Sequence, residues 1–228
     1  MLRGAGGRIL SALVYLHGFA SGPLSTKAQF FRARLEDMGA ELAIPDLAPD
    51  FTHVTVSGML DIVQPLLGPG TVLLGSSLGG YLAALAAARE PGRVRAIVLF
   101  APAFGFAARW EERLGPAAAA EWRTRGTMTV MHWGTGREEP LAYDLIADAR
   151  RHPEEPDPAC PALVFAGRHD DTVPLDGVAA FAARRPATRE LVVLDAGHEM
   201  TEVLEPLWEG TVAFLRRIGA LHPPREVS

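Results

Sequence analysis

The sequence predicts an α/β fold, a mostly parallel sheet with helices on both faces. Short apolar runs alternate with segments of helical spacing along most of the chain, and this order is typical of βαβ units. Runs such as AIVLF and ALVFA are apolar at every position, as expected of strands that are covered on both faces. The length of 228 residues and the 48% hydrophobic content suit one large domain with room for a pocket.

The first half of the chain supplies four expected strands, over residues 8–18, 41–47, 71–75 and 94–102. Three expected helices lie between them, over residues 26–38, 56–67 and 78–89. The first of these helices has apolar residues at helical spacing, namely Phe30, Phe31, Leu35 and Met38. Pro65 is expected to disturb the end of the second helix, because proline lacks the N–H that a helix interior needs.

The second half continues with strands over residues 161–167 and 189–197 and with helices over 175–184 and about 207–218. Residues 103–158 interrupt this alternation and hold three of the four tryptophans, although residues 141–152 again have helical spacing. Because this segment is inserted between two core strands, we expect it to be a cap over one end of the sheet. Residues 1–228 are therefore predicted to form a single domain with a cap insertion at about 103–158.

Charge and composition exclude several classes of function. The net charge is −5 and the Lys and Arg residues are scattered, so neither nucleic acid nor an anionic membrane is an expected partner. No apolar run reaches the roughly 20 residues of a membrane span. The lone Cys160 cannot form an internal disulfide, which fits a reducing cytoplasm, and its context indicates a small core residue. No metal-ligand spacing and no G-x-G-x-x-G are present, so no metal or cofactor is expected.

The stretch GSSLG, residues 75–79, joins an apolar strand directly to a helix rich in alanine and leucine. A strand that turns this sharply at the carboxyl end of a sheet presents one side chain at the apex, and the residues two before and two after must be nearly without side chains. Ser77 is at the centre of this G-x-S-x-G pattern. Ser76 is one position off, so its hydroxyl is expected to point away. The sequence therefore predicts Ser77 as a nucleophile.

A serine nucleophile needs a base and an acid that orients the base. For a serine at such an elbow the two follow in the chain order Asp or Glu, then His. His198 follows the strand predicted over 189–197, and Asp170 and Asp171 follow the strand predicted over 161–167. All these residues are expected on the same rim of the sheet as Ser77. The spacing by itself does not choose between Asp170 and Asp171.

The other histidines and the other aspartate near these strands are less suitable as the base or the acid. His17 follows the first strand and is expected to brace its loop by hydrogen bonds, whereas His132 belongs to the cap and is a candidate for substrate contact. Asp195 also ends a strand, but it lies on the same loop as His198. His169 is next to the two aspartates, but its position does not place it at the end of a strand in the way that His198 is placed. The remaining histidines lie in polar or terminal contexts and are expected to be solvated: His53, His152 and His222.

The motifs LHGF, GSSLGG, GRHDDTVP and AGHEM make the sequence similar to the serine α/β-hydrolases over nearly its full length. Within that superfamily, HGFASGPLSTKAQFF, the elbow and LAYDLIADARRHP before CPALVFAGRHDDTVP resemble the small carboxylesterases and acyl-protein thioesterases, including depalmitoylating hydrolases. The resemblance implies that the acid is Asp170, the Asp of D-x-x-V-P. It also implies that the backbone N–H groups of Phe19 and Leu78 form the oxyanion hole. It is weaker across residues 103–135.

The resemblance implies hydrolysis of a small-molecule carboxylic ester or thioester through an acyl-enzyme, without a cofactor. A cap with few fixed charges favours a small apolar acyl group, if Arg109, Glu111, Glu112 and Arg113 face solvent. The possible pocket residues are then Trp110, Trp122, Met128, Met131 and Trp133, although core packing explains them equally well. A peptidase, a lactonase or a carbon–carbon hydrolase would use the same triad. A catalytically silent, ligand-binding α/β-hydrolase is a further alternative, and the oligomeric state is left open.

Overall fold

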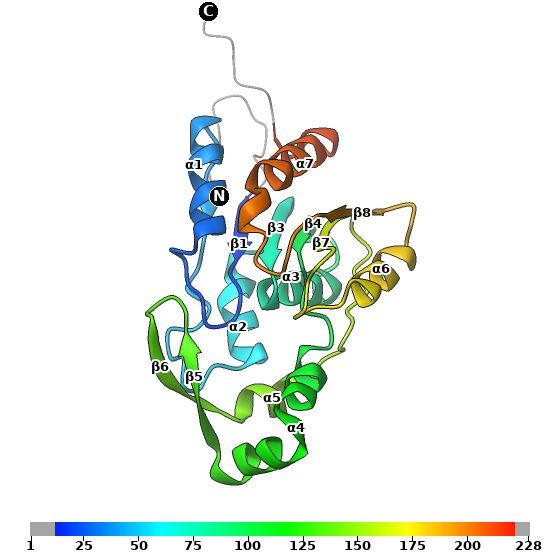
Figure 1. Ribbon diagram of the computed structural model, residues 1–228. Coiled ribbons are helices and arrows are strands. Elements are labelled where there is room, and N and C mark those ends of the chain that lie inside the picture. The colour runs from blue at the N-terminus through cyan, green and yellow to red at the C-terminus, as the bar shows by residue number, and fades with distance from the viewer. Residues whose placement is uncertain (1–11, 222–228) are drawn as a thin grey trace, which may run out of the picture.

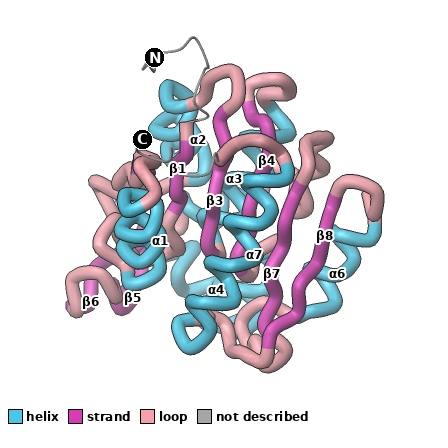
Figure 2. Tube along the Cα trace, turned by 90° about the horizontal axis from the view of Figure 1, so that it is seen from above, coloured by secondary structure: helices cyan, strands magenta, loops and turns pink. Residues whose placement is uncertain are grey.

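The computed structural model describes residues 12–221. In this part of the chain, six parallel strands form one sheet in the order β2-β1-β3-β4-β7-β8 (Figures 1 and 2). They are β1 (Leu13–Leu16), β2 (Leu42–Ala43), β3 (Thr71–Ser76), β4 (Val94–Phe100), β7 (Ala162–Gly167) and β8 (Arg189–Leu194). The helices of this alternation are α1 (Thr26–Asp37), α2 (Val56–Val63), α3 (Leu78–Arg89), α6 (Leu175–Ala183) and α7 (Leu204–Arg217). None of the described helices could cross a membrane, being too short or too polar.

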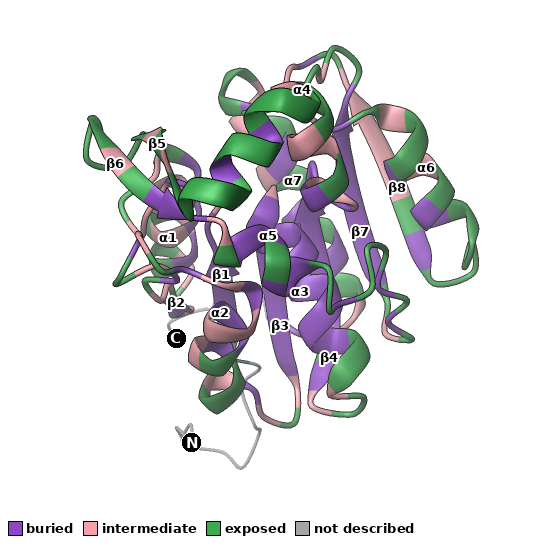
Figure 3. Ribbon diagram, turned by 90° about the horizontal axis from the view of Figure 1, so that it is seen from below, coloured by how far each residue is buried: buried purple, intermediate pink, exposed green. Residues whose placement is uncertain are grey.

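Helices cover both faces of the sheet because each strand sends alternate side chains to opposite sides. In β3, Leu73 belongs to one core cluster, together with side chains of α2, α3 and α6. Its neighbours Val72 and Leu74 belong to a second cluster, which α1 and α7 complete. Figure 3 shows that buried residues fill the central strands, whereas the outer surfaces of α4 and α6 are exposed. The predicted two-faced α/β sheet is thus confirmed.

The elements differ from the expected ranges mainly in length. The strand predicted over 41–47 is only two residues long, since Pro45 cannot donate to a strand ladder. The helix predicted over 56–67 ends at Val63 and continues as a 3-10 turn, η1 (Gln64–Leu66), which contains Pro65. The helix at the C-terminal end begins at Leu204, after a 3-10 turn η2 (Thr201–Val203). The first part of the strand predicted over 8–18, residues 8–11, lies outside the described residues, as does His222.

Between β4 and β7 the chain forms α4 (Phe106–Arg125), the antiparallel hairpin β5 (Thr127–His132) and β6 (Arg137–Ala142), and α5 (Asp144–Ala149). Figure 1 shows these elements grouped at one end of the molecule. The hairpin is not apparent from the sequence, and its second strand replaces the first residues of the helix predicted over 141–152. The α4 helix is broken at Gly115, whose φ of 77° and ψ of 160° are not helical, just before Pro116.

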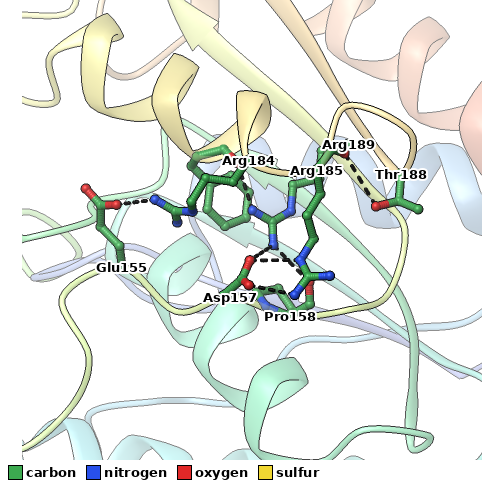
Figure 4. Close-up of polar contacts among 8 residues, drawn as sticks. Glu155, Asp157, Pro158, Arg184, Arg185, Thr188 and Arg189 are labelled. Atoms are coloured by element: carbon green, nitrogen blue, oxygen red, sulfur yellow. Dashed lines mark hydrogen bonds and ion pairs between the residues drawn. The ribbon is translucent and has the colours of Figure 1, made fainter.

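A cluster of charged side chains connects the end of the segment between β4 and β7 to β8 and the loop before it (Figure 4). Asp157 accepts hydrogen bonds from Arg185 Nε at 3.0 Å and Nη2 at 2.6 Å, and it also pairs with the buried Arg189 at the start of β8. Arg189 donates in addition to the carbonyl oxygens of Phe181 at 2.7 Å and Pro158 at 2.9 Å. Hydrogen bonds from Arg185 and Arg189 hold the pKa of Asp157 well below its usual value. The segment is therefore anchored where it rejoins β7.

Candidate active site

Close backbone packing gives the β3–α3 turn its shape. A Cβ on Gly75 would lie 2.3 Å from the Gly79 carbonyl oxygen, and one on Gly79 would lie 2.1 Å from the Leu16 carbonyl oxygen. No side chain fits at either position. Ser77 between them has φ 52° and ψ −116°, a conformation that costs a non-glycine residue about 1–3 kcal/mol. Its N–H donates to the Phe100 carbonyl at 2.9 Å, which helps to hold it there.

Three side chains from the carboxyl ends of three strands meet at this turn. The Ser77 Oγ lies 2.9 Å from the His198 Nε2, and the His198 Nδ1 lies 2.8 Å from the Asp170 Oδ2. Parallel strands end at one edge of a sheet, so β3, β7 and β8 deliver these residues to the same place although they are far apart in sequence. The arrangement can pass a proton from the serine hydroxyl to the imidazole while the carboxylate stabilises the charge.

The Asp170 side chain is only 2% exposed, and its loop is built around it. Its Oδ1 accepts the N–H groups of Thr172 at 2.9 Å and Val173 at 2.7 Å. Burial would raise the pKa of Asp170, but the hydrogen bonds from His198, Val173 and Thr172 outweigh it and lower the pKa. Asp171 is exposed, and its carboxylate accepts a hydrogen bond from the Thr172 hydroxyl at 3.1 Å. The structure thus places Asp170, rather than Asp171, against the imidazole.

Asp195, the other acid considered, is exposed and paired with His169 at 2.7 Å instead of with His198. His152 is not solvated, contrary to expectation. It is buried beside Ser57 Oγ at 3.1 Å and the Asp148 carboxylate at 3.3 Å, and it contacts Arg89. This network joins α2, α3 and α5 away from the elbow. Sequence context missed it because its members come from α2, α3, α5 and the turn after α5, which only the tertiary structure brings together.

The backbone N–H groups of Leu78 and Phe19 flank the serine. Leu78 is the first residue of α3. Phe19 follows Gly18, where an added Cβ would lie 3.5 Å from the Ser77 Cβ. Among the described residues, neither N–H donates a backbone hydrogen bond. His17 braces the same loop as expected. Its Nε2 accepts the Leu47 N–H at 3.1 Å and its Nδ1 lies 3.0 Å from the Gly18 carbonyl oxygen.

A cavity of about 1410 Å³ opens above Ser77 and His198. One wall of the cavity is aromatic. The centroid of the Phe19 ring lies 5.5 Å from that of Phe51 and 4.7 Å from that of Trp110, and the Phe19 and Trp110 rings meet edge to face. Trp133, at the tip of the β5–β6 hairpin, and the buried His132 also line the cavity. Trp110, Trp133 and His132 are thus cavity residues.

The other three suggested pocket residues do not line this cavity. Trp122 is 2% exposed and belongs to the core, where its indole N–H donates to the Leu141 carbonyl at 3.0 Å. Met128 packs on the same core, and Met131 lies on the exposed side of β5. Successive residues of a strand point to opposite sides of it. Because the β5–β6 hairpin was not predicted, the sequence did not show which of these side chains would face the core and which the cavity or solvent.

Replacing the core tryptophan is expected to lower stability far more than replacing the rim tryptophan. Trp122→Ala should cost about 3–5 kcal/mol, or roughly 10 °C in Tm for a chain of this size, because Trp122 is fully packed. Trp133→Ala is the matched control and should change Tm little, since Trp133 is 76% exposed. Thermal unfolding of both variants measures this difference. Similar Tm losses would contradict the placement of Trp122.

Charged side chains in the cavity were not foreseen. Arg109 was expected to face solvent but is half-buried, where burial lowers its pKa, and it lines the cavity together with the exposed Arg113. The two lie one turn apart on the face of α4 that also carries Trp110, and this spacing is the sequence signal that could have found them. Glu111 is also partly buried, where it accepts hydrogen bonds from Tyr143 at 2.7 Å and Arg123 at 3.1 Å. Lys27, at the start of α1, lines the cavity as well.

One family model matches nearly the whole of the described chain. The model described as an uncharacterised protein family, UPF0227, matches residues 12–216, which is most of the chain. The chain belongs to the UPF0227 family. The family description names no activity, so the chemistry of this UPF0227 member has to be argued from its site.

Solved structures place this UPF0227 chain in the α/β-hydrolase fold. Mouse alpha/beta hydrolase domain-containing protein 10 is 20% identical with a TM-score of 0.77, and the match covers 95% of this chain and 92% of that one. Est1E from Butyrivibrio proteoclasticus, solved with bound ferulic acid, is 19% identical with a TM-score of 0.75, covering 92% and 90%. At such identities the likeness shows the fold. The predicted α/β-hydrolase fold is confirmed.

Proposed function

We propose that the chain is a serine hydrolase that cleaves carboxylic esters or thioesters through an acyl-enzyme intermediate. The observation that carries this proposal is the continuous hydrogen-bonded chain from Ser77 Oγ through His198 to Asp170, with distances of 2.9 and 2.8 Å. The strained Ser77 backbone supports it, because strain of this kind gathers at functional sites. The metagenome-derived lipolytic enzymes among the structural neighbours agree with the proposal but do not carry it.

The reaction follows from the geometry. His198 Nε2 accepts the Ser77 proton as the Oγ attacks the carbonyl carbon, and Asp170 keeps the imidazole in the tautomer with its free lone pair on Nε2. The imidazolium then gives that proton to the departing alcohol or thiol, leaving an acyl group on Ser77. Water repeats the sequence with His198 as base and releases the carboxylic acid.

The flanking N–H groups of Phe19 and Leu78 are proposed to receive the negative charge that develops on the carbonyl oxygen. Donors aimed at such an oxyanion are each worth about 3 kcal/mol. The aromatic wall of Phe19, Phe51 and Trp110 suits an apolar acyl group beside the serine. We propose that the acyl group lies along this wall and the leaving group faces the open side of the cavity.

A fluorophosphonate probe tests the proposal, because it forms a covalent bond only with an activated serine. The protein is expected to gain one adduct, and peptide mapping should place it on Ser77. Prior incubation with p-nitrophenyl butyrate should slow labelling, since the ester occupies the same serine. Absence of labelling, or an adduct on Ser76 instead, would refute the assignment.

A further inference from the structure

We propose that Lys27 and Tyr15 form a recess of the cavity that binds a carboxylate group carried by the ester substrate. The two residues line the same cavity as Ser77 and His198. They lie on the α1 side of the elbow, whereas the aromatic wall lies on the α4 side. The inference rests on the proposed ester hydrolysis and adds a substrate class to it.

Lys27 is a buried cation whose direct contacts in the described part of the chain are the Ser76 hydroxyl and the Phe100 ring, with its centroid 5.7 Å from the Nζ. The side chain is 5% exposed, and its Nζ donates to the Ser76 Oγ at 3.0 Å. No carboxylate oxygen of residues 12–221 lies within 4.0 Å of the Nζ. Lys27 also stands in the first turn of α1, where the helix dipole disfavours a positive charge. Burying an unpaired charge is costly, which points to a partner that arrives with the substrate.

Tyr15 supplies a second unsatisfied group at the same place. The residue is 1% exposed, and its hydroxyl makes no well-formed hydrogen bond in the described part of the chain, although Ser76 is close enough to affect its pKa. Buried polar groups are nearly always satisfied. A carboxylate has two oxygens and can accept from a hydroxyl and an ammonium together.

The position next to the nucleophile limits the substrate. Ser76, which accepts the hydrogen bond from Lys27, immediately precedes Ser77, and Lys27 and Ser77 line the same cavity. We therefore place the carboxylate and the scissile carbonyl of one short substrate together in that cavity. Burial lowers the pKa of Lys27 to about 8, while Glu199, Glu202 and Asp170 act to raise it, so the ammonium form prevails at neutral pH. The ligand class that fits is a short monoester of a dicarboxylic acid, with its free carboxylate on Lys27.

Binding to the Ser77→Ala protein tests this without turnover. Methyl hydrogen succinate, which carries one carboxylate, is compared with dimethyl succinate, which carries none, by calorimetry at neutral pH. The anionic ester is expected to bind at least about tenfold more tightly, as a charge-assisted hydrogen bond implies. Lys27→Met in the same background should remove the preference, and Lys27→Arg should keep most of it. Tyr15→Phe should weaken it.

The Glu199→Gln variant keeps the test decisive if Lys27→Met fails to fold, which thermal unfolding detects. Glu199 is exposed beside the recess and acts electrostatically on both Lys27 and Tyr15, so its removal should strengthen binding of the anionic ester. Equal affinities for the two esters would overturn the recess, as would a preference that survives Lys27→Met. No gain with Glu199→Gln would overturn it too. Because binding is read without hydrolysis, failure of ester cleavage by the unmodified protein would refute the proposed function separately.

Discussion

Ser77→Ala is expected to lower kcat for p-nitrophenyl butyrate by roughly 10⁵–10⁶-fold, as removal of the catalytic serine does in a serine protease. The substitution removes only the hydroxyl that faces His198 Nε2 at 2.9 Å. Alanine keeps the Cβ, so the strained turn with φ 52° is unchanged and Tm should stay close to that of the unmodified protein. Steady-state kinetics and thermal unfolding of the same sample separate a lost nucleophile from a lost fold.

Ser76→Ala is the matched control for this result. The Ser76 hydroxyl accepts a hydrogen bond from the Lys27 ammonium, and loss of a hydrogen bond to a charged group costs about 1.5–3 kcal/mol of stability. Because the Ser77 hydroxyl is the one that faces His198, the expected decrease in kcat/KM for Ser76→Ala is at most about tenfold. A comparable collapse of activity in both variants would mean that the elbow as a whole, and not the Ser77 hydroxyl, had been damaged.

Asp170→Asn is expected to lower kcat by about 10⁴-fold, the cost of the same change in serine proteases. The amide oxygen can still accept the Thr172 and Val173 N–H groups, so the loop should keep its shape. The amide nitrogen then faces His198 Nδ1, where the carboxylate oxygen now lies at 2.8 Å. An NH₂ group there donates to Nδ1 and forces the proton onto Nε2, so the imidazole can no longer accept the Ser77 proton.

Asp171→Asn provides the comparison, because Asp171 is exposed and lies one residue away. It should change kcat little, since its carboxylate accepts the Thr172 hydroxyl, whereas the carboxylate on His198 is that of Asp170. The two variants are measured with one neutral ester across pH 6–9, to exclude a simple shift of the pH optimum. A larger loss for Asp171→Asn would reassign the acid to the neighbouring residue.

The local pattern of the sequence was enough to predict an α/β fold and the order of the strands and helices of its main sheet, and the motifs that resemble the serine α/β-hydrolases specified the fold further. Strands buried on both faces must be apolar at every position, and the turn at Ser77 requires glycine at positions 75 and 79 because backbone atoms occupy the space of any Cβ there. Residues that follow parallel strands share one edge of the sheet, so Ser77, Asp170 and His198 could be placed together before any distance was known. The sequence did not choose between Asp170 and Asp171 by spacing alone.

What lines the cavity was decided by the tertiary structure. The same tryptophan-rich segment holds Trp122 in the core and Trp110 and Trp133 at the cavity, because the packing of α4 against an unpredicted hairpin determines which side chain faces which way. No pattern in the sequence singles out Lys27. It becomes a buried cation beside the nucleophile only because α1 packs on the sheet where β3 ends, and a contact between residues 49 positions apart follows from that packing and from no local pattern.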